Sequence, residues 1–164
     1  MRGMPPHAPD QPRRRGALPL ALLVAACAVG LGAWWALRAS DARELERALT
    51  PWAEGALPGP DTPIDEALAD LGARVFDARC QACHAVHGEP RLGPNLEGVT
   101  LRRDYAWIRA MVMAPDSMTR EDPVARALLQ GYQVQMLVAG GMDAARTRAV
   151  LEFLRRVDAG PAGG

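Results

Sequence analysis

Cys80-Gln81-Ala82-Cys83-His84 is the stretch of this 164-residue chain that decides its fold. One turn of helix brings residues three positions apart to the same side, so the two thiols can reach one ligand together. The spacing, with a histidine directly after the second cysteine, is the attachment signature of a c-type haem, whose iron the histidine binds. We therefore predict one covalent haem c, attached at Cys80 and Cys83, with His84 as an axial ligand of the iron.

A structural zinc site or a redox-active disulfide fits the two cysteines less well. Structural zinc takes four protein ligands, yet the other cysteine and histidine residues are only Cys27, His7 and His87. A thioredoxin-like pair lies at a strand-to-helix junction, whereas residues 67–85 have a helical pattern throughout.

Composition favours one small domain with an N-terminal appendage. Every basic side chain is arginine, and beyond residue 15 there are 15 of them against 18 acidic residues, a formal charge of −3. No basic patch indicates a nucleic-acid partner. A domain of about 90 residues buries limited apolar surface by itself, so the haem would form part of the core.

Residues 16–37 carry no charge, and their 22 residues are enough for a membrane-spanning helix. They follow Arg13-Arg14-Arg15, and basic residues before a span hold that end in the cytoplasm. Trp34 and Trp35 near the far end fit an interfacial aromatic belt. We expect a single-pass anchor in a bacterial cytoplasmic membrane, with the rest of the chain facing the periplasm.

Two other interpretations of the N-terminus export the same domain. A cleaved secretory signal has a shorter apolar core and a small-x-small exit site, which this long segment ending in tryptophans does not match well. Val24-Ala25-Ala26-Cys27 resembles a bacterial lipobox, in which Cys27 would be lipidated, although ten uncharged residues follow it. Cys27 can equally be a small apolar residue of a membrane helix.

The segment between the apolar stretch and the cysteines is predicted to be a tether. Residues 40–49 alternate in charge and can continue as a solvated helix, and the prolines and glycines of residues 51–63 then interrupt regular structure. Such a linker would let the domain swing on the membrane. The predicted division is 1–15 cytoplasmic segment, 16–38 anchor or signal, 39–63 linker, 64–158 haem domain and 159–164 disordered tail.

Helical patterns surround the haem motif. Asp65 is among the start signals of a helix that leads into the cysteines, and further helices are predicted over residues 105–113, 122–130 and 144–157. Gly72 costs its helix about 1 kcal/mol, so we expect another backbone to pass close to it. The closing helix is the expected partner, through Val150, Leu151, Phe153 and Leu154.

Residues 64–157 resemble a class I c-type cytochrome. The resemblance rests on Gly72, Phe76 and the haem motif, then Gly93-Pro94-Asn95-Leu96, then Trp107 and a methionine before the closing helix. It implies an all-α domain in which three main helices surround one haem, with histidine and methionine on its two faces. It further implies that the Pro94 carbonyl accepts the proximal imidazole N–H, which orients the ring and raises its basicity. Trp107 and Tyr132 would pack in the core or contact the haem.

The family layout places the ligand methionine in a loop just before the terminal helix. Met136 meets that position, 52 residues beyond His84, in a short irregular stretch. It is followed by Leu137, where family members commonly have proline. Met118, after Pro115-Asp116, is the alternative ligand.

The remaining candidates have other expected roles. Met111 and Met113 lie in a predicted helix, where methionine usually fills core space. Met142 precedes Asp143, an N-cap, and an apolar residue there usually packs back onto its helix. His87 follows His84 by three residues on the same side of the haem, so we expect a loop histidine.

Two protein ligands on the iron indicate electron transfer rather than catalysis. The resemblance thus implies a single-haem electron carrier, not an enzyme, with redox proteins of the respiratory chain as weakly docked partners. One alternative is a haem-containing subunit or assembly factor of a respiratory oxidase or denitrification complex. A haem sensor or peroxidase with an open sixth site is the other.

Overall fold

The computed structural model describes residues 17–52, 57–59, 61–138 and 140–160, and within these ranges it consists of helices and loops without a strand. The elements are α1 (Ala17–Leu49), the 3-10 helix η1 (Thr50–Trp52), α2 (Glu66–Arg79), α3 (Val99–Arg102), α4 (Tyr105–Met113), α5 (Pro115–Glu121), α6 (Pro123–Tyr132) and α7 (Ala144–Ala159). The chain divides into two units, residues 1–43 and 44–164, each described by itself. The predicted cytoplasmic segment and residues 161–164 of the predicted tail lie outside the described residues.

Helix α1 carries the apolar segment. Its large side chains lie open, as Leu22 at 68% and Trp35 at 68% exposure illustrate. The guanidinium of Arg38 lies 4.9 Å from the ring centroid of Trp34, one helical turn away. Among the described residues this is the one helix long and apolar enough to cross a membrane, by length and composition. Its surface is therefore compatible with a single membrane span.

The end of α1 and η1 differ from the predicted solvated tether. Residues up to Leu49 are helical as expected, but Leu49 is only 2% exposed and belongs to the core of the second unit. Leu45 and Trp52 pack against the same core. Residues four apart share one face of a helix, so Leu45 and Leu49 bury together while their charged neighbours point outward. The predicted linker thus contributes to the domain core as far as Trp52.

Polar contacts fix this segment on α7. Glu46 forms an ion pair with Arg146, which also pairs with Asp143 at the start of the helix. The guanidinium of Arg148 lies 5.3 Å from the ring centroid of Trp52. Two arginines near the start of α7, Arg146 and Arg148, therefore hold the residues that follow the apolar segment.

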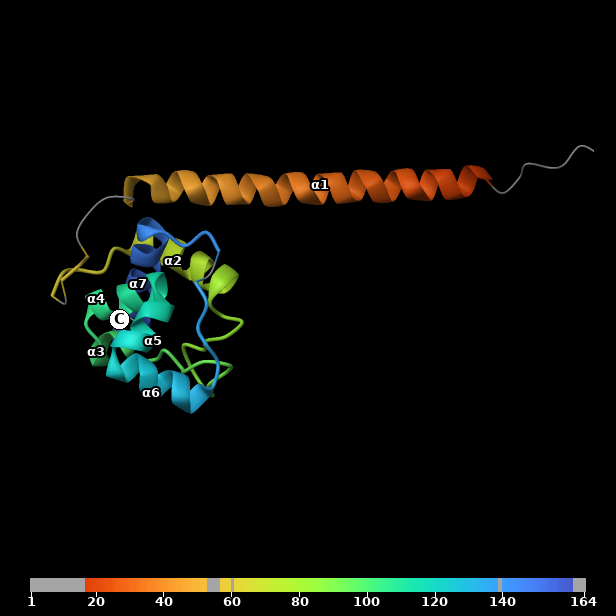
Figure 1. Ribbon diagram of the computed structural model, residues 1–164. Coiled ribbons are helices and arrows are strands. Elements are labelled where there is room, and N and C mark those ends of the chain that lie inside the picture. Colours follow the sequence, from red (N-terminus) through yellow and green to blue (C-terminus); the bar gives the residue numbers. More distant parts are fainter. Residues whose placement is uncertain (1–16, 53–56, 60, 139, 161–164) are drawn as a thin grey trace, which may run out of the picture. The chain divides into compact units, whose positions relative to one another are not determined.

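The crossing of α2 and α7 forms the centre of the domain (Figure 1). A Cβ atom on Gly72 would lie 1.9 Å from the carbonyl oxygen of Ala149, so the two backbones are in direct contact there. One helical turn further along each helix, the ring centroids of Phe76 and Phe153 lie 5.3 Å apart. The predicted close approach at Gly72 is confirmed.

Aspartates set the helix starts. The carboxylates of Asp65, Asp104, Asp122 and Asp143 each accept a backbone N–H from three residues further along. The predicted helix over 105–113 is confirmed as α4, and the helix predicted from Asp122 is confirmed as α6. The short helices α3 and α5 were not expected from the sequence, because neither is long enough to show a helical repeat of apolar residues.

A buried ion pair ties the beginning of the domain to its end. Glu152 is 2% and Arg155 6% exposed, and Arg155 donates to both carboxylate oxygens at 2.8 Å. Arg155 also donates to the carbonyl of Thr62, and Glu152 accepts from the Asp65 N–H at 3.4 Å. Each side chain of this buried pair therefore has hydrogen-bond partners that offset part of the cost of its burial.

We predict that Gly72→Ala destabilises the domain by about 1–3 kcal/mol or more, because the added methyl overlaps the Ala149 carbonyl and neither backbone can yield cheaply. Denaturant unfolding of the full chain, followed by circular dichroism, measures this. The matched control is Gly131→Ala on α6, where a Cβ meets nothing within 4 Å and helix propensity should improve stability by up to about 1 kcal/mol. Equal effects of the two changes would contradict the close packing.

We also predict that Leu49→Ala lowers the free energy of unfolding of the haem domain by about 2–5 kcal/mol, because it opens a cavity in the core. The same unfolding measurement applies. Leu101→Ala removes the same atoms from a side chain that is 78% exposed and should change stability by less than about 0.5 kcal/mol. A Leu49 variant as stable as this control would show that the segment is a tether.

Candidate haem site

The attachment turn follows directly on the end of α2. The helix stops at Arg79, with Cys80 as its C-cap, so the prediction of helix through residue 85 was too long. One further turn continues the chain, in which the N–H groups of Cys83 and His84 donate to the Cys80 carbonyl at 3.0 and 2.9 Å. This turn carries both thiols and the imidazole within five residues, as the sequence motif requires.

His84 is oriented by the segment that follows the turn. Its Nδ1 lies 2.9 Å from the carbonyl oxygen of Pro94, as the resemblance implied. Because that oxygen can only accept, Nδ1 carries the proton, and Nε2 keeps its lone pair for a metal. A Cβ on Gly93 would lie 2.7 Å from Cε1 of the ring, so only glycine lets the backbone pass so close. Gly93 is fixed in turn by its N–H bond to the Cys83 carbonyl at 2.8 Å.

The two thiols lie in different environments. Cys80 is half-buried and packs against the hydrophobic core, whereas Cys83 is exposed. Burial, with a smaller contribution from Cys83, raises the pKa of the Cys80 thiol to about 11, so it is protonated at neutral pH. The apolar setting of Cys80 and the open setting of Cys83 would suit a cofactor that is partly buried in the core and partly exposed.

The loop after α6 contains Met136. Gln133 ends the helix in a left-handed conformation with φ 55°, and Met136 itself is partly buried. The amide nitrogen of Gln135 donates to the Met136 carbonyl at 3.1 Å. Near its other end the loop passes Arg79, since a Cβ on Gly141 would lie 3.6 Å from that guanidinium. The loop thus returns to the residue that immediately precedes the attachment turn.

Three other methionines of the domain make contacts within the protein fold. The sulfur of Met113 accepts a hydrogen bond from the Thr147 hydroxyl at 3.1 Å, which joins α4 to α7. Met142 packs on the core just before the Asp143 cap, which confirms the prediction for it. Met118, the alternative ligand, lies within α5 rather than in a loop, and its carbonyl accepts a hydrogen bond from the backbone N–H of Asp122.

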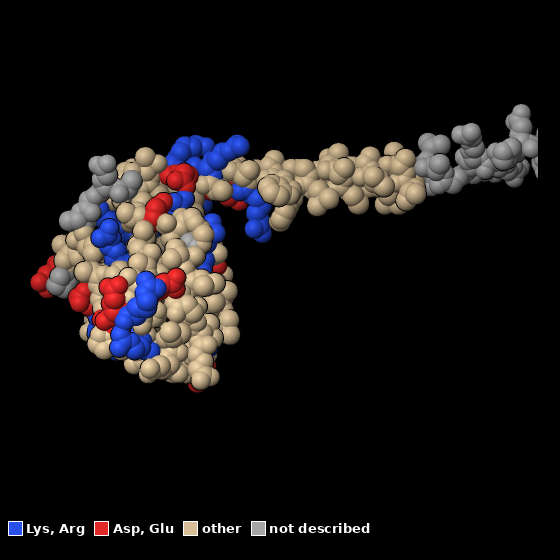
Figure 2. Space-filling model, in the orientation of Figure 1, with Lys and Arg blue, Asp and Glu red and all other residues tan. Residues whose placement is uncertain are grey.

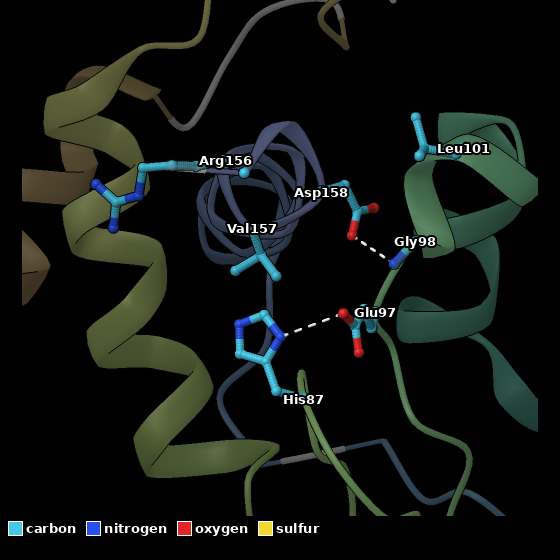
Figure 3. A pocket seen from close by; sticks show the side chains of 8 residues that line it. His87, Glu97, Gly98, Leu101, Arg156, Val157 and Asp158 are labelled. Atoms are coloured by element: carbon cyan, nitrogen blue, oxygen red, sulfur yellow. Dashed lines mark hydrogen bonds and ion pairs between the residues drawn. The ribbon is translucent and has the colours of Figure 1, made fainter. Parts of the chain in front are cut away.

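His87 is a loop histidine, as expected. Its side chain is 66% exposed and lies 3.5 Å from a carboxylate oxygen of Glu97. Figure 3 shows the two side chains pointing toward one another at the rim of a surface hollow. The side chain of Val157, on α7, points toward the His87 ring. On the other side of this hollow Asp158 accepts from the Gly98 N–H at 2.6 Å. The hollow contains neither of the haem cysteines and is separate from the attachment turn.

Trp107 offers a further polar atom to a ligand. Its indole Nε1 is buried and has no partner within hydrogen-bond distance among the described residues. The pKa of Asp122 is lowered, mainly by the hydrogen bond from the Ala125 N–H and to a smaller degree by the nearby Trp107 indole, which lies beyond hydrogen-bond distance. Tyr132, at the end of α6, is half-buried. A buried donor without an acceptor is costly unless a ligand supplies one.

These features together fit a covalent haem. The turn presents two thiols, and the His84 imidazole presents Nε2. The close contact of the Gly93 backbone with the ring, here called the glycine cradle, keeps the imidazole in place. The buried indole N–H of Trp107, which has no acceptor within hydrogen-bond distance among the described residues, suits an acidic substituent of the macrocycle.

Comparison with known proteins agrees with the site. The sequence model of the family "Cytochrome c" matches residues 69–158, more than half of the chain. The chain belongs to the cytochrome c family. Haem c is accordingly the cofactor of this cytochrome, with Cys80 and Cys83 in its attachment motif.

Solved structures extend the likeness over the whole domain. Cytochrome c from Rhodothermus marinus is 34% identical, with a TM-score of 0.59 over 65% of this cytochrome and 89% of that chain. An engineered form of that protein, bound to a carbene intermediate, is 31% identical, with a TM-score of 0.56 over 70% of this chain and 98% of its own.

Curated relatives match over shorter stretches. Cytochrome c of Tetrahymena pyriformis is 39% identical over 44 residues, which is 27% of this chain and 40% of the relative. The cytochrome c-553-like protein of Synechocystis is 37% identical over 46 residues, 28% of this chain and 44% of the relative. With a third, from Theileria parva, matched over 50% of its length, this cytochrome spans at most half of these three proteins.

We predict that Gly93→Ala displaces the His84 ring, because the methyl would lie within 2.7 Å of it. The visible spectrum of the holoprotein should change and its free energy of unfolding should fall by about 1–3 kcal/mol. Gly140→Ala is the matched control in the loop between α6 and α7 that contains Met136, here called the methionine loop, since a Cβ there meets nothing within 4 Å. Identical spectra and stabilities for the two variants would contradict the cradle.

Proposed function

We propose that this protein is a single-haem electron carrier attached to the outer face of a bacterial cytoplasmic membrane. The observation that carries the proposal is the orientation of His84, whose Nδ1 is engaged by the Pro94 carbonyl at 2.9 Å. This leaves Nε2 as the one nitrogen able to bind iron, and the hydrogen bond increases its basicity. His84 is the proposed proximal ligand.

Met136 is the proposed second axial ligand. Three observations support it: its loop returns to Arg79, its side chain is partly buried, and the sulfur of Met113 is already engaged. Met118 remains the alternative, but its backbone is committed to α5. A thioether and an imidazole together stabilise ferrous iron and raise the reduction potential.

Bound haem supplies one-electron chemistry between ferrous and ferric iron. His84 and Met136, as the two proposed ligands, would together leave no position on the iron for a substrate. The chain therefore acts by binding and tuning the cofactor, with Cys80 and Cys83 preventing its loss. An engineered relative holds a carbene intermediate, which belongs to that altered protein and assigns no catalysis here.

Helix α1 is the proposed membrane anchor. Its exposed apolar side chains need an apolar solvent, and Trp34 with Arg38 suits the interface at the outer end. The arginines of residues 13–15 would hold the preceding segment in the cytoplasm, which places the haem domain, about residues 64–158, in the periplasm.

Redox proteins, such as those of a respiratory chain, are the proposed partners. Large apolar side chains are exposed on both segments that flank the proposed haem ligands, with Leu92 at 58% and Leu137 at 76%. The face of the domain that carries these loops is mostly uncharged in Figure 2. A small apolar contact of this kind suits brief docking between partners rather than a permanent interface.

We expect Met136→Ala to abolish the weak sulfur-to-iron band near the red edge of the oxidised visible spectrum, because the thioether is its source. The sample consists of membranes from cells that express the full chain together with haem-maturation enzymes. Met118→Ala is the matched control and should keep the band. The reverse pattern would transfer the ligand assignment to Met118.

Two further measurements separate the alternatives. Carbon monoxide should not bind the reduced wild-type protein at neutral pH, whereas rapid binding would indicate a sensor or peroxidase with an open site. Stoichiometric co-purification with an oxidase or denitrification complex would instead indicate a subunit or assembly factor. Absence of haem after denaturation and solvent extraction of the polypeptide would refute covalent attachment itself.

A further inference from the structure

The side chain of Gln135 links the proposed ligand loop to α5. Its amide oxygen lies 3.3 Å from the hydroxyl of Thr119, and its amide nitrogen donates to the Met136 carbonyl at 3.1 Å. Thr119 is 8% exposed, so one end of this link is inside the domain. The backbone of Met136 is thereby connected through one side chain to a buried residue of a neighbouring helix.

Thr119 is itself held in place. Its hydroxyl lies 3.0 Å from the Pro115 carbonyl and 3.2 Å from that of Asp116, within the same helix. The hydroxyl has one proton, so it donates to one of these two carbonyl oxygens or to the Gln135 amide oxygen at any time. Pro115 is fully buried at the start of α5, so the helix end that receives Gln135 is anchored in the domain.

Among the described residues, few contacts other than this link restrain the loop that contains Met136. Its outer residues are open to solvent, since Val134 is 49%, Leu137 76% and Val138 50% exposed. Leu137 carries a backbone N–H and an unrestricted φ, where a proline would limit the conformations of the chain after the ligand. The loop therefore depends on side-chain contacts to hold Met136.

We propose that Gln135 is a positioning residue for the sixth ligand. By bonding Thr119 and the Met136 backbone together, it keeps the thioether at the iron and slows its departure. The inference rests on the proposed function, in particular on Met136 as the ligand. Because Gln135 acts through the Met136 backbone, its effect is on how often the ligand is released.

The test measures ligand release in the full-length holoprotein. Added imidazole replaces methionine on ferric haem at a rate that follows spontaneous loss of the thioether. We expect Gln135→Ala to accelerate replacement about two- to tenfold, which corresponds to the loss of an ordinary hydrogen bond. The sulfur-to-iron band should weaken at a lower temperature than in the wild type.

Matched variants separate positioning from general destabilisation. Gln130→Ala removes the same side chain from an exposed site on α6 and should leave the imidazole rate unchanged. Thr119→Val should reproduce the Gln135 effect, and Thr119→Ser, which keeps the hydroxyl, should restore the wild-type rate. Gln135→Ala and Gln130→Ala with equal imidazole rates would overturn the inference.

The ligand assignment is checked separately. If Met136→Ala abolishes the sulfur band while Gln135→Ala has no effect on the imidazole rate, the proposed ligand stands and the positioning role fails. If Met136→Ala retains the band, the ligand assignment fails first, and the role of Gln135 fails with it.

Discussion

The contact between the backbones of α2 and α7 at Gly72 is the constraint on which the remaining structure depends. Helices normally pack through side chains at 8–10 Å between axes, and a glycine at the crossing allows a closer approach. The closer the helices lie, the more completely residues on either side of the crossing are buried, among them Leu68, Val75 and Val150. The helix propensity that α2 loses at Gly72 is thus offset by closer packing along both helices.

Each end of this crossing leads to one half of the proposed haem site. The attachment turn begins where α2 ends at Arg79, and the methionine loop ends where α7 begins at Ala144. The proximity of Gly141 to Arg79 brings these two chain segments together. Residues more than fifty positions apart can therefore serve one cofactor because the two helices that support them are fixed against each other. The short helices α3 to α6 occupy the chain between them.

Sequence alone predicted the parts of the structure that local chemistry determines. The attachment motif, the caps at Asp65, Asp122 and Asp143, and the close approach at Gly72 each follow from a residue type with a specific structural role. The His84–Pro94 hydrogen bond followed from the family resemblance. The helix end after Arg79 was missed, because the turn that carries the cysteines has helical spacing without continuing the helix. The sequence also gave no sign of the Thr119–Gln135 contact, since two ordinary polar residues sixteen positions apart carry no signal of their own.

Burial of Leu49 also bears on where the polypeptide can be cut. The family match begins only at residue 69, and the prolines after Trp52 look like a natural boundary for a soluble fragment. A cut there would remove a core leucine together with the Glu46 carboxylate that pairs with Arg146. Proteases that release such a fragment would yield a loosened haem domain. A water-soluble form with its interior intact must begin at or before Glu44, inside what a sequence-based division assigns to the linker.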